Sequence, residues 1–323
     1  MEKKDPLKVS IGKLLLRTPL MTASGTSGSK DELERLRERE KVLNCLGAFV
    51  TKGVTLEPRL GNPSYRVIET RTGCLNSIGL QNSGAKIFLQ NELPRMLKYE
   101  LPLIINISAS SVEEFGKLAA YLVENDANNI IDGIEINVSC PNIREGGVAF
   151  GVSPKLVERI VRTVKKNVGT HCVIITKLTP NVTDITLPAK AAINGGADAL
   201  SMINTLRGMA INIENGKPFL GGIYGGLSGP AIKPIGISMV YDCFGKIIEC
   251  RDKIIPIIGI GGISTWQDAL EYIMAGATAI GVGTAWFVNT NVFHEIKLGI
   301  ENYLRKYDVS INEIIGKAHE RKS

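Results

Sequence analysis

Eight short segments of the chain are almost continuously apolar, and most of them are rich in valine and isoleucine. Strands that are buried on both faces have this pattern, because neither face of the sheet meets water. Each segment is therefore predicted to be a strand of a largely parallel sheet. The predicted strands cover residues 19–24, 48–52, 102–108, 133–139, 173–178, 199–204, 254–259 and 277–281.

Several intervals between these strands have the apolar spacing of amphipathic helices. Three of them begin at a serine that is followed directly by proline, or three residues later by glutamate or glutamine, which are signals of a helix start. Gly276 is expected to end the third helix, because glycine readily adopts the backbone conformation that follows a helix. The three start signals are Ser111 with Glu114, Ser153 with Pro154, and Ser264 with Gln267.

The alternation of strands and helices predicts the α/β class and a (β/α)₈ TIM barrel rather than a doubly wound sheet. We expect a single domain over residues 1–323, with a short N-terminal hairpin at residues 9–16. The intervals after the second and sixth strands are the longest, so residues 53–80 and 206–230 are predicted to be long active-site insertions. Barrel enzymes carry their active-site loops at this end of the strands.

Composition and charge narrow the class of protein further. Hydrophobic residues make up 44% of the chain, and Lys and Arg exceed Asp and Glu by six (38 − 32). This excess is spread along the chain, so it favours a small anionic ligand over nucleic acid. The six cysteines lack the spacing of a metal site, the N-terminus has no apolar signal region, and no apolar stretch is long enough to span a membrane. We therefore expect a cytoplasmic chain that binds neither a metal nor a membrane.

Polar residues recur where the predicted strands end. Because the carboxyl ends of parallel barrel strands meet at one mouth, we expect these residues to share a site. Any one of them could simply terminate a strand, but their recurrence at six or more ends favours a binding site. Amides and two lysines suit a planar ligand rich in carbonyl and imide groups. The residues are Ser24, Lys52, Asn106, Asn137, Lys177, Asn204 and Thr205.

Glycines mark the ends of the last two predicted strands, at Gly261-Gly262 and at Gly283-Thr284. Exposed backbone N–H groups at such positions can approach phosphate oxygens closely. A Rossmann dinucleotide site is not indicated, because the full glycine spacing and the later acidic residue are missing. The sequence therefore predicts a phosphate site at these two strand ends.

Cys140 lies between Ser139 and Pro141, just after the fourth predicted strand. Most cysteines act as small buried hydrophobes. Since the three histidines lie outside the strand ends, Cys140 is the best candidate for proton transfer. Cys74 lies in the long loop beside the proposed site, and its role is left open. The remaining cysteines are interpreted as buried residues: Cys45, Cys172, Cys243 and Cys250.

Four motifs carry a resemblance to a known family: residues 76–82 (NSIGLQN), 137–142 (NVSCPN), 202–205 (MINT) and 225–234 (GGLSGPAIKP). Over residues 9–307 the chain resembles the dihydroorotate dehydrogenases of pyrimidine biosynthesis, which are FMN enzymes on a (β/α)₈ barrel. Cys140 is similar to the base of the soluble class. Residues 75–82 and the Gly-Leu-Ser-Gly-Pro run resemble the NAD-linked two-subunit type rather than the fumarate-linked type.

The resemblance also implies residue roles. Lys177 would lie near the N1/O2 edge of the flavin, where a cation stabilises the negative charge of the reduced cofactor. The FMN-binding residues would be Ser24, Lys52, Gly53, Asn106, Asn137, Lys177, Ile203, Gly229, Gly261, Gly262, Gly283 and Thr284. The residues that bind the substrate would be Lys52, Asn76, Ser77, Ile78, Gly79, Leu80, Asn137, Asn142, Asn204 and Thr205.

The implied reaction oxidises dihydroorotate to orotate. Cys140 would remove the C5 proton while a hydride passes from C6 to N5 of FMN. The electrons would reach NAD through a partner subunit that carries FAD and a [2Fe–2S] cluster, in a heterotetramer built on a dimer of catalytic subunits. Three alternatives stay open: a dihydropyrimidine dehydrogenase-like FMN barrel, a fumarate-linked dihydroorotate dehydrogenase, and a non-catalytic barrel that senses a phosphorylated ligand.

Overall fold

The computed structural model describes residues 5–27, 39–126, 128–139, 144–145, 148–248 and 255–320. Eight parallel strands pair in the order β3-β18-β17-β12-β11-β8-β7-β4. A bridge between Met21 and Ala48 links the two end strands, so the sheet is nearly closed into a barrel. This confirms the predicted α/β barrel. The strands are β3 (Leu20–Thr22), β4 (Phe49–Val50), β7 (Leu103–Ile107), β8 (Ile131–Asn137), β11 (Val173–Lys177), β12 (Ala199–Met202), β17 (Ile257–Ile260) and β18 (Ala279–Val282).

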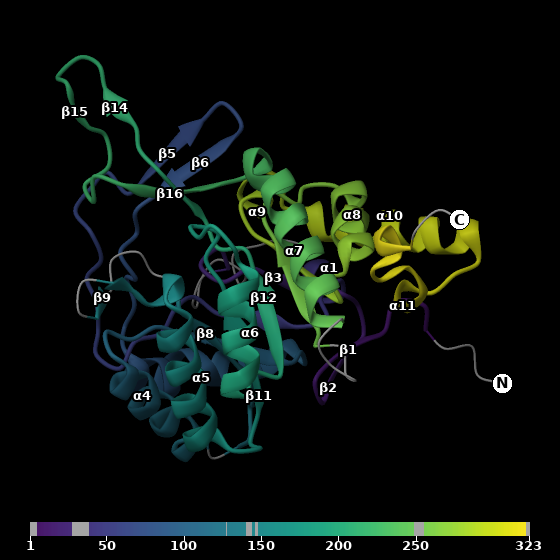
Figure 1. The fold of residues 1–323 in the computed structure, drawn as a ribbon, viewed down its shortest axis with the longest axis horizontal. Helices are drawn as coiled ribbons and strands as arrows, with labels where there is room; N and C mark the ends of the chain where they lie inside the picture. The colour runs from purple at the N-terminus through teal and green to yellow at the C-terminus, as the bar shows by residue number, and fades with distance from the viewer. Residues whose placement is uncertain are drawn as a thin grey trace.

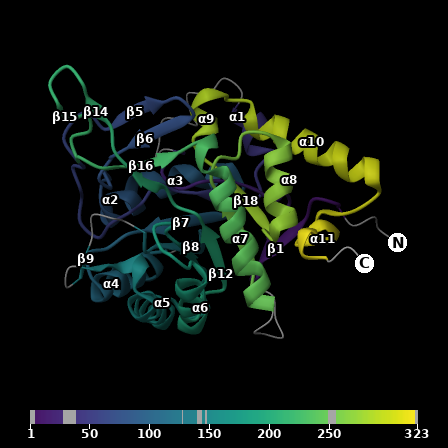
Figure 2. The same cartoon turned by 45° about the horizontal axis from the view of Figure 1, so that its top comes forward.

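Helices surround this sheet on the outside (Figure 1). Both views show α4, α5 and α6 side by side on one flank and α7, α8 and α10 on another (Figure 2). The helices of the barrel wall are α1 (Arg39–Leu43), α4 (Val112–Glu124), α5 (Pro154–Val168), α6 (Thr186–Gly195), α7 (Lys233–Ile248), α8 (Trp266–Ala275), α9 (Ala285–Val288), α10 (Val292–Tyr307) and α11 (Ile311–Ile314). Shorter helical segments are α2 (Ala85–Ile87), α3 (Leu93–Met96) and the turns at Phe88–Glu92, Leu97–Tyr99, Phe150–Val152, Pro230–Ile232 and Lys317–His319.

The barrel strands are buried on both faces, as their apolar sequences predict. All five residues of β7 are buried, and so are all four residues of β12, β17 and β18. Leucine, isoleucine and valine fill the space between the strands and the surrounding helices. Several buried polar residues interrupt this core on the barrel strands, and Asn106, Glu135, Lys177 and Ser201 are among them.

Two segments outside the barrel wall combine into a second sheet. Strands β5 (Val67–Thr70) and β6 (Gly73–Asn76) follow β4, whereas β13 (Leu206–Gly208) and β16 (Gly225–Ser228) follow β12. These strands pair in the order β13-β16-β6-β5, so segments about 150 residues apart form one antiparallel sheet. The hairpin of β14 (Ile211–Asn212) and β15 (Lys217–Pro218) projects away from the body of the molecule (Figure 1). The smaller ribbons are β1 (Val9–Ile11) with β2 (Leu14–Leu16), and β9 (Arg144–Glu145) with β10 (Val148–Ala149).

Two of the three predicted helix starts are found at the expected residue. Ser111 is the N-cap of α4 and accepts a hydrogen bond from the Glu114 N–H at 3.1 Å. The Glu114 carboxylate accepts from the backbone of Ser110 instead of completing the capping box. Helix α5 begins at Pro154 after Ser153, as predicted.

The prediction for the start of α8 was wrong by one residue. Its N-cap is Thr265, which forms a reciprocal capping box with Asp268. The physical reason is that the Asp268 carboxylate accepts hydrogen bonds from the backbone N–H groups of Ser264 (3.0 Å) and Thr265 (2.9 Å). Gln267 is exposed and has no part in this cap. Gly276 ends the helix with a positive φ, as predicted.

Asp268 also joins the start of α8 to the start of α7. The Lys233 Nζ lies 2.8 Å from Asp268 Oδ1 and 2.8 Å from Glu271 Oε2. Burial alone would raise the pKa of Asp268, but hydrogen bonds from Lys233, Ser264 and Thr265 outweigh burial and hold this pKa below its ordinary value. Because the native carboxyl binds a proton less readily than the unfolded one, its stabilisation is present above the unfolded pKa and is lost as pH falls.

We expect Asp268→Ala to lower the free energy of unfolding by about 2–3 kcal/mol at neutral pH, since charge-assisted hydrogen bonds are lost and backbone donors are left unpaired. Gln267→Ala is the matched control and should stay within about 0.5 kcal/mol of the parent. Urea unfolding at several pH values measures both. The difference between Asp268→Ala and the parent should shrink as pH falls through the native pKa of Asp268. An equal cost for the two variants would contradict the assigned cap.

Candidate active site

Lys177 lies at the carboxyl end of β11, with its ammonium inside the barrel mouth. Its Nζ donates a hydrogen bond to Ser24 Oγ at 2.7 Å, just past the end of β3. The same nitrogen lies 3.8 Å from Glu135 Oε2, and the side chains of Lys177 and Glu135 are only 4% and 2% exposed. A buried ammonium requires such partners, because an isolated charge away from water is costly. Two predicted site residues, Ser24 and Lys177, therefore meet across the barrel.

Glu135 connects four neighbouring strands at this level. Its Oε2 accepts a hydrogen bond from Asn106 Nδ2 at 2.6 Å, and its Oε1 accepts from Ser201 Oγ at 2.7 Å. Strand register explains the contacts, because Asn106 pairs with Glu135 and Lys177 pairs with Ser201. Glu135 and Ser201 were missed in the sequence prediction. The available signal was a carboxylate in the middle of an otherwise apolar strand, which is rarely buried without partners.

Asn137, Asn204 and Thr205 lie together above this network. Asn204 Nδ2 lies 3.4 Å from Asn137 Oδ1, and the Thr205 N–H donates to Asn204 Oδ1 at 2.7 Å. Ser139 donates its hydroxyl to the Lys177 carbonyl at 2.9 Å, which fixes the backbone that follows β8. The structure therefore brings together three of the residues predicted to hold the substrate.

The antiparallel sheet adds Asn76 to the same side of the mouth. Asn76 Nδ2 donates to the Gly226 carbonyl at 3.3 Å. A Cβ atom on Gly226 would lie 2.0 Å from Thr205 Oγ1, so Thr205 packs directly against this strand. The loop after Asn76 then approaches the barrel, since a Cβ on Gly53 would lie 3.4 Å from Leu80 Cδ2 and 3.1 Å from Asn106 Oδ1.

Within residues 76–80, some hydrogen-bonding groups already have a partner in the protein and are not free to bind a ligand. The Ser77 hydroxyl accepts a hydrogen bond from Asn62 Nδ2 at 2.7 Å, and the Ile78 carbonyl accepts from the Asn62 backbone at 3.0 Å. Asn62 therefore holds this segment from outside. Gly79 has a φ of +77°, and a Cβ there would lie 2.5 Å from the Asn62 nitrogen, so only glycine fits. The tight turn at Gly79 places Leu80 beside Gly53.

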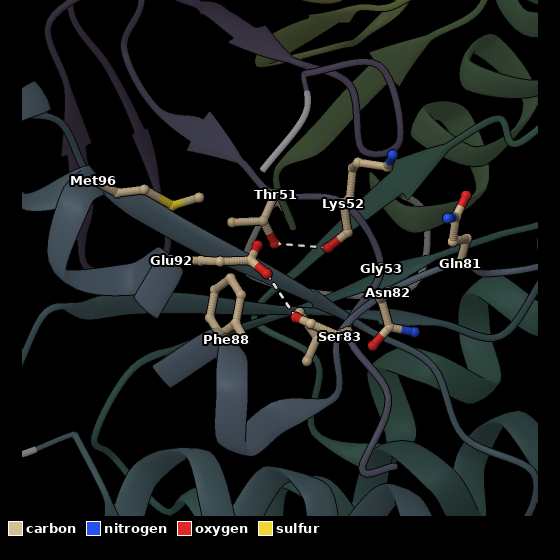
Figure 3. Close-up of a pocket in the computed structure, with 10 residues that line it drawn as sticks. Thr51, Lys52, Gly53, Gln81, Asn82, Ser83, Phe88, Glu92 and Met96 are labelled. Carbon is tan, nitrogen blue, oxygen red and sulfur yellow. Dashed lines mark hydrogen bonds between the residues drawn. The ribbon is translucent and has the colours of Figure 1, made fainter. Parts of the chain in front are cut away.

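Lys52 follows β4 at the rim of a small cavity of about 40 Å³. Figure 3 shows the Lys52 side chain turned away from Glu92, whose carboxylate accepts a hydrogen bond from Ser83 Oγ at 2.6 Å. A cavity for a cofactor is usually several hundred cubic ångströms. This cavity holds only a few water molecules, so it is at most the edge of a larger site around Lys52 and Gly53. The lining residues include Thr51, Lys52, Gly53, Val54, Asn82 and Phe88.

The glycine-rich strand ends are packed against one another at the other side of the mouth. Gly229, Gly261 and Gly262 all have positive φ, at +98°, +131° and +68°. A Cβ on Gly262 would lie 2.8 Å from the Gly229 carbonyl oxygen and 2.9 Å from the Lys233 nitrogen. Side chains are excluded here, which leaves bare backbone at this corner. Such a corner suits phosphate oxygens, which accept hydrogen bonds from backbone N–H groups.

The remaining predicted cofactor residues surround this corner. Thr284 Oγ1 lies 2.8 Å from Ser228 Oγ, which links the end of β18 to the end of β16. Ile203 is buried, and its backbone N–H donates to the Ile260 carbonyl at 2.9 Å. A Cβ on Gly283 would lie 3.5 Å from Thr26 Cγ2, so Gly283 faces the segment after β3. The structure therefore brings the residues that were predicted to bind a phosphate close together.

Comparison with known proteins assigns the chain to a family. The family model for dihydroorotate dehydrogenase matches residues 6–304. The chain belongs to the dihydroorotate dehydrogenase family. It is 49% identical over 311 residues to the "Dihydroorotate dehydrogenase B (NAD(+)), catalytic subunit" of Thermoanaerobacter sp. (strain X514), a match that covers 96% of this chain and 98% of the relative.

Other relatives carry the same name. The protein of Caldicellulosiruptor bescii is 48% identical over 96% of this chain and 98% of its own length. The protein of Citrifermentans bemidjiense is 44% identical over 98% of this chain and 99% of its own length. These matches confirm the family resemblance drawn from the four motifs, and they cover the whole barrel rather than one part of it.

Two of the predicted site residues lie outside the described residues, namely Cys140 and Asn142. Cys74, whose role the sequence left open, lies on β6 with its Sγ 3.3 Å from Ser228 Oγ. Ser108 is a further residue that the prediction omitted. Its hydroxyl is fully buried near Gly53 and has no hydrogen-bond partner among the residues that the structure describes. A buried polar group without a partner at the mouth is a signal for a ligand contact.

Two further surveys concern the described residues only. Among them, no group of His, Cys, Asp and Glu side chains is arranged to hold a metal ion. None of their helices is long and apolar enough to cross a membrane.

Proposed function

We propose that this chain is the catalytic subunit of an NAD-linked dihydroorotate dehydrogenase, which oxidises dihydroorotate to orotate in de novo pyrimidine biosynthesis in the cytoplasm. The single observation that carries the proposal is the meeting of Lys177 and Ser24 with the asparagine cluster at one barrel mouth. Family membership over residues 6–304 supports the same reaction. A non-catalytic sensor would leave this buried arrangement of lysine and carboxylate without a purpose.

The described residues fit FMN as the resident cofactor. The bare backbone around Gly229, Gly261 and Gly262 fits a phosphate, and the partnerless Ser108 hydroxyl lies near Gly53 on the opposite side of the barrel. We assign the cofactor site to Ser24, Lys52, Gly53, Asn106, Asn137, Lys177, Ile203, Gly229, Gly261, Gly262, Gly283 and Thr284. When bound, FMN accepts the hydride that leaves C6 of dihydroorotate.

The chain's own residues bind and orient the substrate. Asn76, Asn137, Asn204 and Thr205 offer amide and hydroxyl groups that match the carbonyl and N–H groups of a pyrimidine ring. Lys52 supplies a positive charge for the substrate carboxylate, together with the backbone N–H groups of Ile78, Gly79 and Leu80, whereas the Ser77 N–H already donates to the Arg66 carbonyl at 2.7 Å. Asn142 completes the set by resemblance to the family motif.

Cys140 is proposed as the base that removes the C5 proton. Loss of this proton and of the C6 hydride creates the C5=C6 double bond of orotate, and the thiol then returns its proton to water. The assignment rests on the NVSCPN motif at residues 137–142, and on Ser139 and Lys177, which hold the preceding backbone in place.

A partner subunit is proposed for the exit of electrons. Relatives of nearly equal length carry the name "catalytic subunit", which implies a second subunit in those enzymes. We propose that the partner of this chain carries FAD and a [2Fe–2S] cluster and forms a heterotetramer around a dimer of catalytic chains.

The purified chain is expected to be yellow, and dihydroorotate should bleach its flavin without oxygen, whereas dihydrouracil should not. Dihydrouracil lacks the carboxylate, so it tests the dihydropyrimidine dehydrogenase alternative. The reduced chain should pass electrons to an artificial dye but not to NAD. Flavin absorbance in an anaerobic cuvette measures each step. Bleaching by dihydrouracil, rapid reduction of NAD by this chain alone, or rapid reoxidation by fumarate would contradict the proposed type.

The carboxylate pocket is tested by Lys52→Ala. A charge-assisted contact contributes about 1.5–3 kcal/mol, so this variant should bind orotate about tenfold or more weakly. Lys217→Ala, on the projecting hairpin, is the matched control and should bind orotate like the parent. The change in flavin absorbance on orotate titration gives both affinities. Parental orotate affinity in FMN-loaded Lys52→Ala would show that the pocket is misassigned.

Cys140→Ser and Cys140→Ala test the base. Both should slow flavin reduction by dihydroorotate by ~10² or more, because a hydroxyl or methyl group is not a base at working pH. In the parent the rate should rise with pH as the thiol ionises, since an unperturbed thiol has a pKa of about 8.5. Cys74→Ser is the control and should react at the parental rate. Stopped-flow bleaching measures all three, and a near-parental rate in Cys140→Ala would refute the base assignment.

A further inference from the structure

Glu135 is a buried carboxylate in the middle of β8 that none of the assigned roles uses. Its side chain is 2% exposed, and it faces the barrel interior directly below the proposed site. Replacing a buried ion pair with apolar residues is often neutral or stabilising. Stability therefore gives no reason for a carboxylate at this position, and its partners identify what it does.

Both oxygens of Glu135 are held by neutral donors from flanking strands. Asn106 Nδ2 donates to Oε2 at 2.6 Å, and Ser201 Oγ donates to Oε1 at 2.7 Å. These two bonds fix the plane of the carboxylate. In return, the bond to Oε2 fixes the Asn106 amide, so that its Oδ1 lies on the side of Gly53. Glu135 therefore sets the orientation of a residue in the proposed cofactor site.

The charge of Glu135 acts on Lys177. The Lys177 Nζ is 3.8 Å from Glu135 Oε2, which is ion-pair distance without a short hydrogen bond. Within the described part of the chain, the ammonium donates a hydrogen bond to Ser24 alone. The positive charge of Lys177 and the negative charge of Glu135 sum to zero. The buried network is therefore neutral overall before the flavin is reduced. At low effective dielectric, such a pair of charges has a large influence on a third charge nearby.

We propose that Glu135 is a positioning residue that orients Asn106 and Lys177 and lowers the reduction potential of the bound flavin by offsetting the positive charge of Lys177. This inference rests on the proposed flavin site. A flavin gains negative charge on two-electron reduction, and Lys177 favours that charge. Glu135 opposes it and so keeps the reduced cofactor a strong enough donor for an acceptor of low potential, which an NAD-linked chain requires.

The test is the midpoint potential of the flavin in the FMN-loaded full chain, measured by anaerobic titration against reference dyes. Glu135→Gln keeps the size of the side chain and removes its charge. It should raise the equilibrium constant for flavin reduction tenfold or more, which is about 30 mV for a two-electron couple. Glu135→Asp keeps the charge and should stay closer to the parental potential than Glu135→Gln does.

A purely structural role predicts another pattern. In that case Glu135→Gln and Glu135→Asp would both lose FMN affinity and thermal stability, while the flavin that stays bound keeps the parental potential. That result would overturn the inference. FMN affinity is measured independently, by flavin fluorescence. A change in affinity is thereby distinguished from a change in midpoint potential.

Two more variants keep the inference separate from the proposed site. Lys177→Met should shift the potential downward, opposite to Glu135→Gln. If Lys177→Met leaves the potential unchanged, the flavin site itself is misplaced; if only Glu135→Gln has no effect, the inference alone fails. Should Glu135→Gln not fold, Ser201→Ala removes a hydroxyl whose positive end faces the carboxylate. It should lower the potential, and a rise would overturn the inference.

Discussion

A closed barrel cannot leave charged groups inside it without partners, and this constraint shapes the whole active site. Lys177 and Glu135 are almost fully buried, so each must be satisfied by neighbours on adjacent strands or across the mouth. Ser24, Asn106 and Ser201 provide those neighbours. Residues on or just after five barrel strands, β3, β7, β8, β11 and β12, therefore bear on the position of one ammonium group. The barrel strands therefore hold the buried charged groups in fixed positions, in addition to supporting the loops.

The second sheet extends this frame beyond the barrel. Strands β6 and β16 pair over the mouth and bring Asn76 next to Gly226 and Thr205. The substrate-facing residues thus come from both the barrel and the antiparallel sheet. At the opposite corner, Lys233 and Asp268 tie α7 to α8 and fix the backbone around Gly262. Charged contacts outside the mouth therefore support the bare backbone inside it.

The proposed chemistry divides the work between these parts. The glycine corner fits the phosphate, the buried network sets the electrostatic field, and the asparagines recognise the ring of the substrate. Preorganised charge is effective because it requires no rearrangement when charge develops during the reaction. The site therefore uses preorganised charge where electrons move, and residues of both the barrel and the antiparallel sheet where the substrate binds.

The sequence by itself determined the eight strands, the barrel class and the family, because burial on both faces leaves a continuous apolar record and the four motifs are local. It also located most residues of the candidate site, since strand ends of a barrel share one mouth. Only the tertiary structure decided how those residues are connected. Asn106 and Ser201 lie 29 and 66 positions from Glu135, and Ser24 lies 153 positions from Lys177. The start of α8 was also misplaced by one residue, because the Asp268 carboxylate, which contacts Lys233 on α7, accepts hydrogen bonds from the backbone of Ser264 and Thr265. Contacts between distant segments depend on the order and register of the strands. The local pattern of apolar residues predicts neither of them.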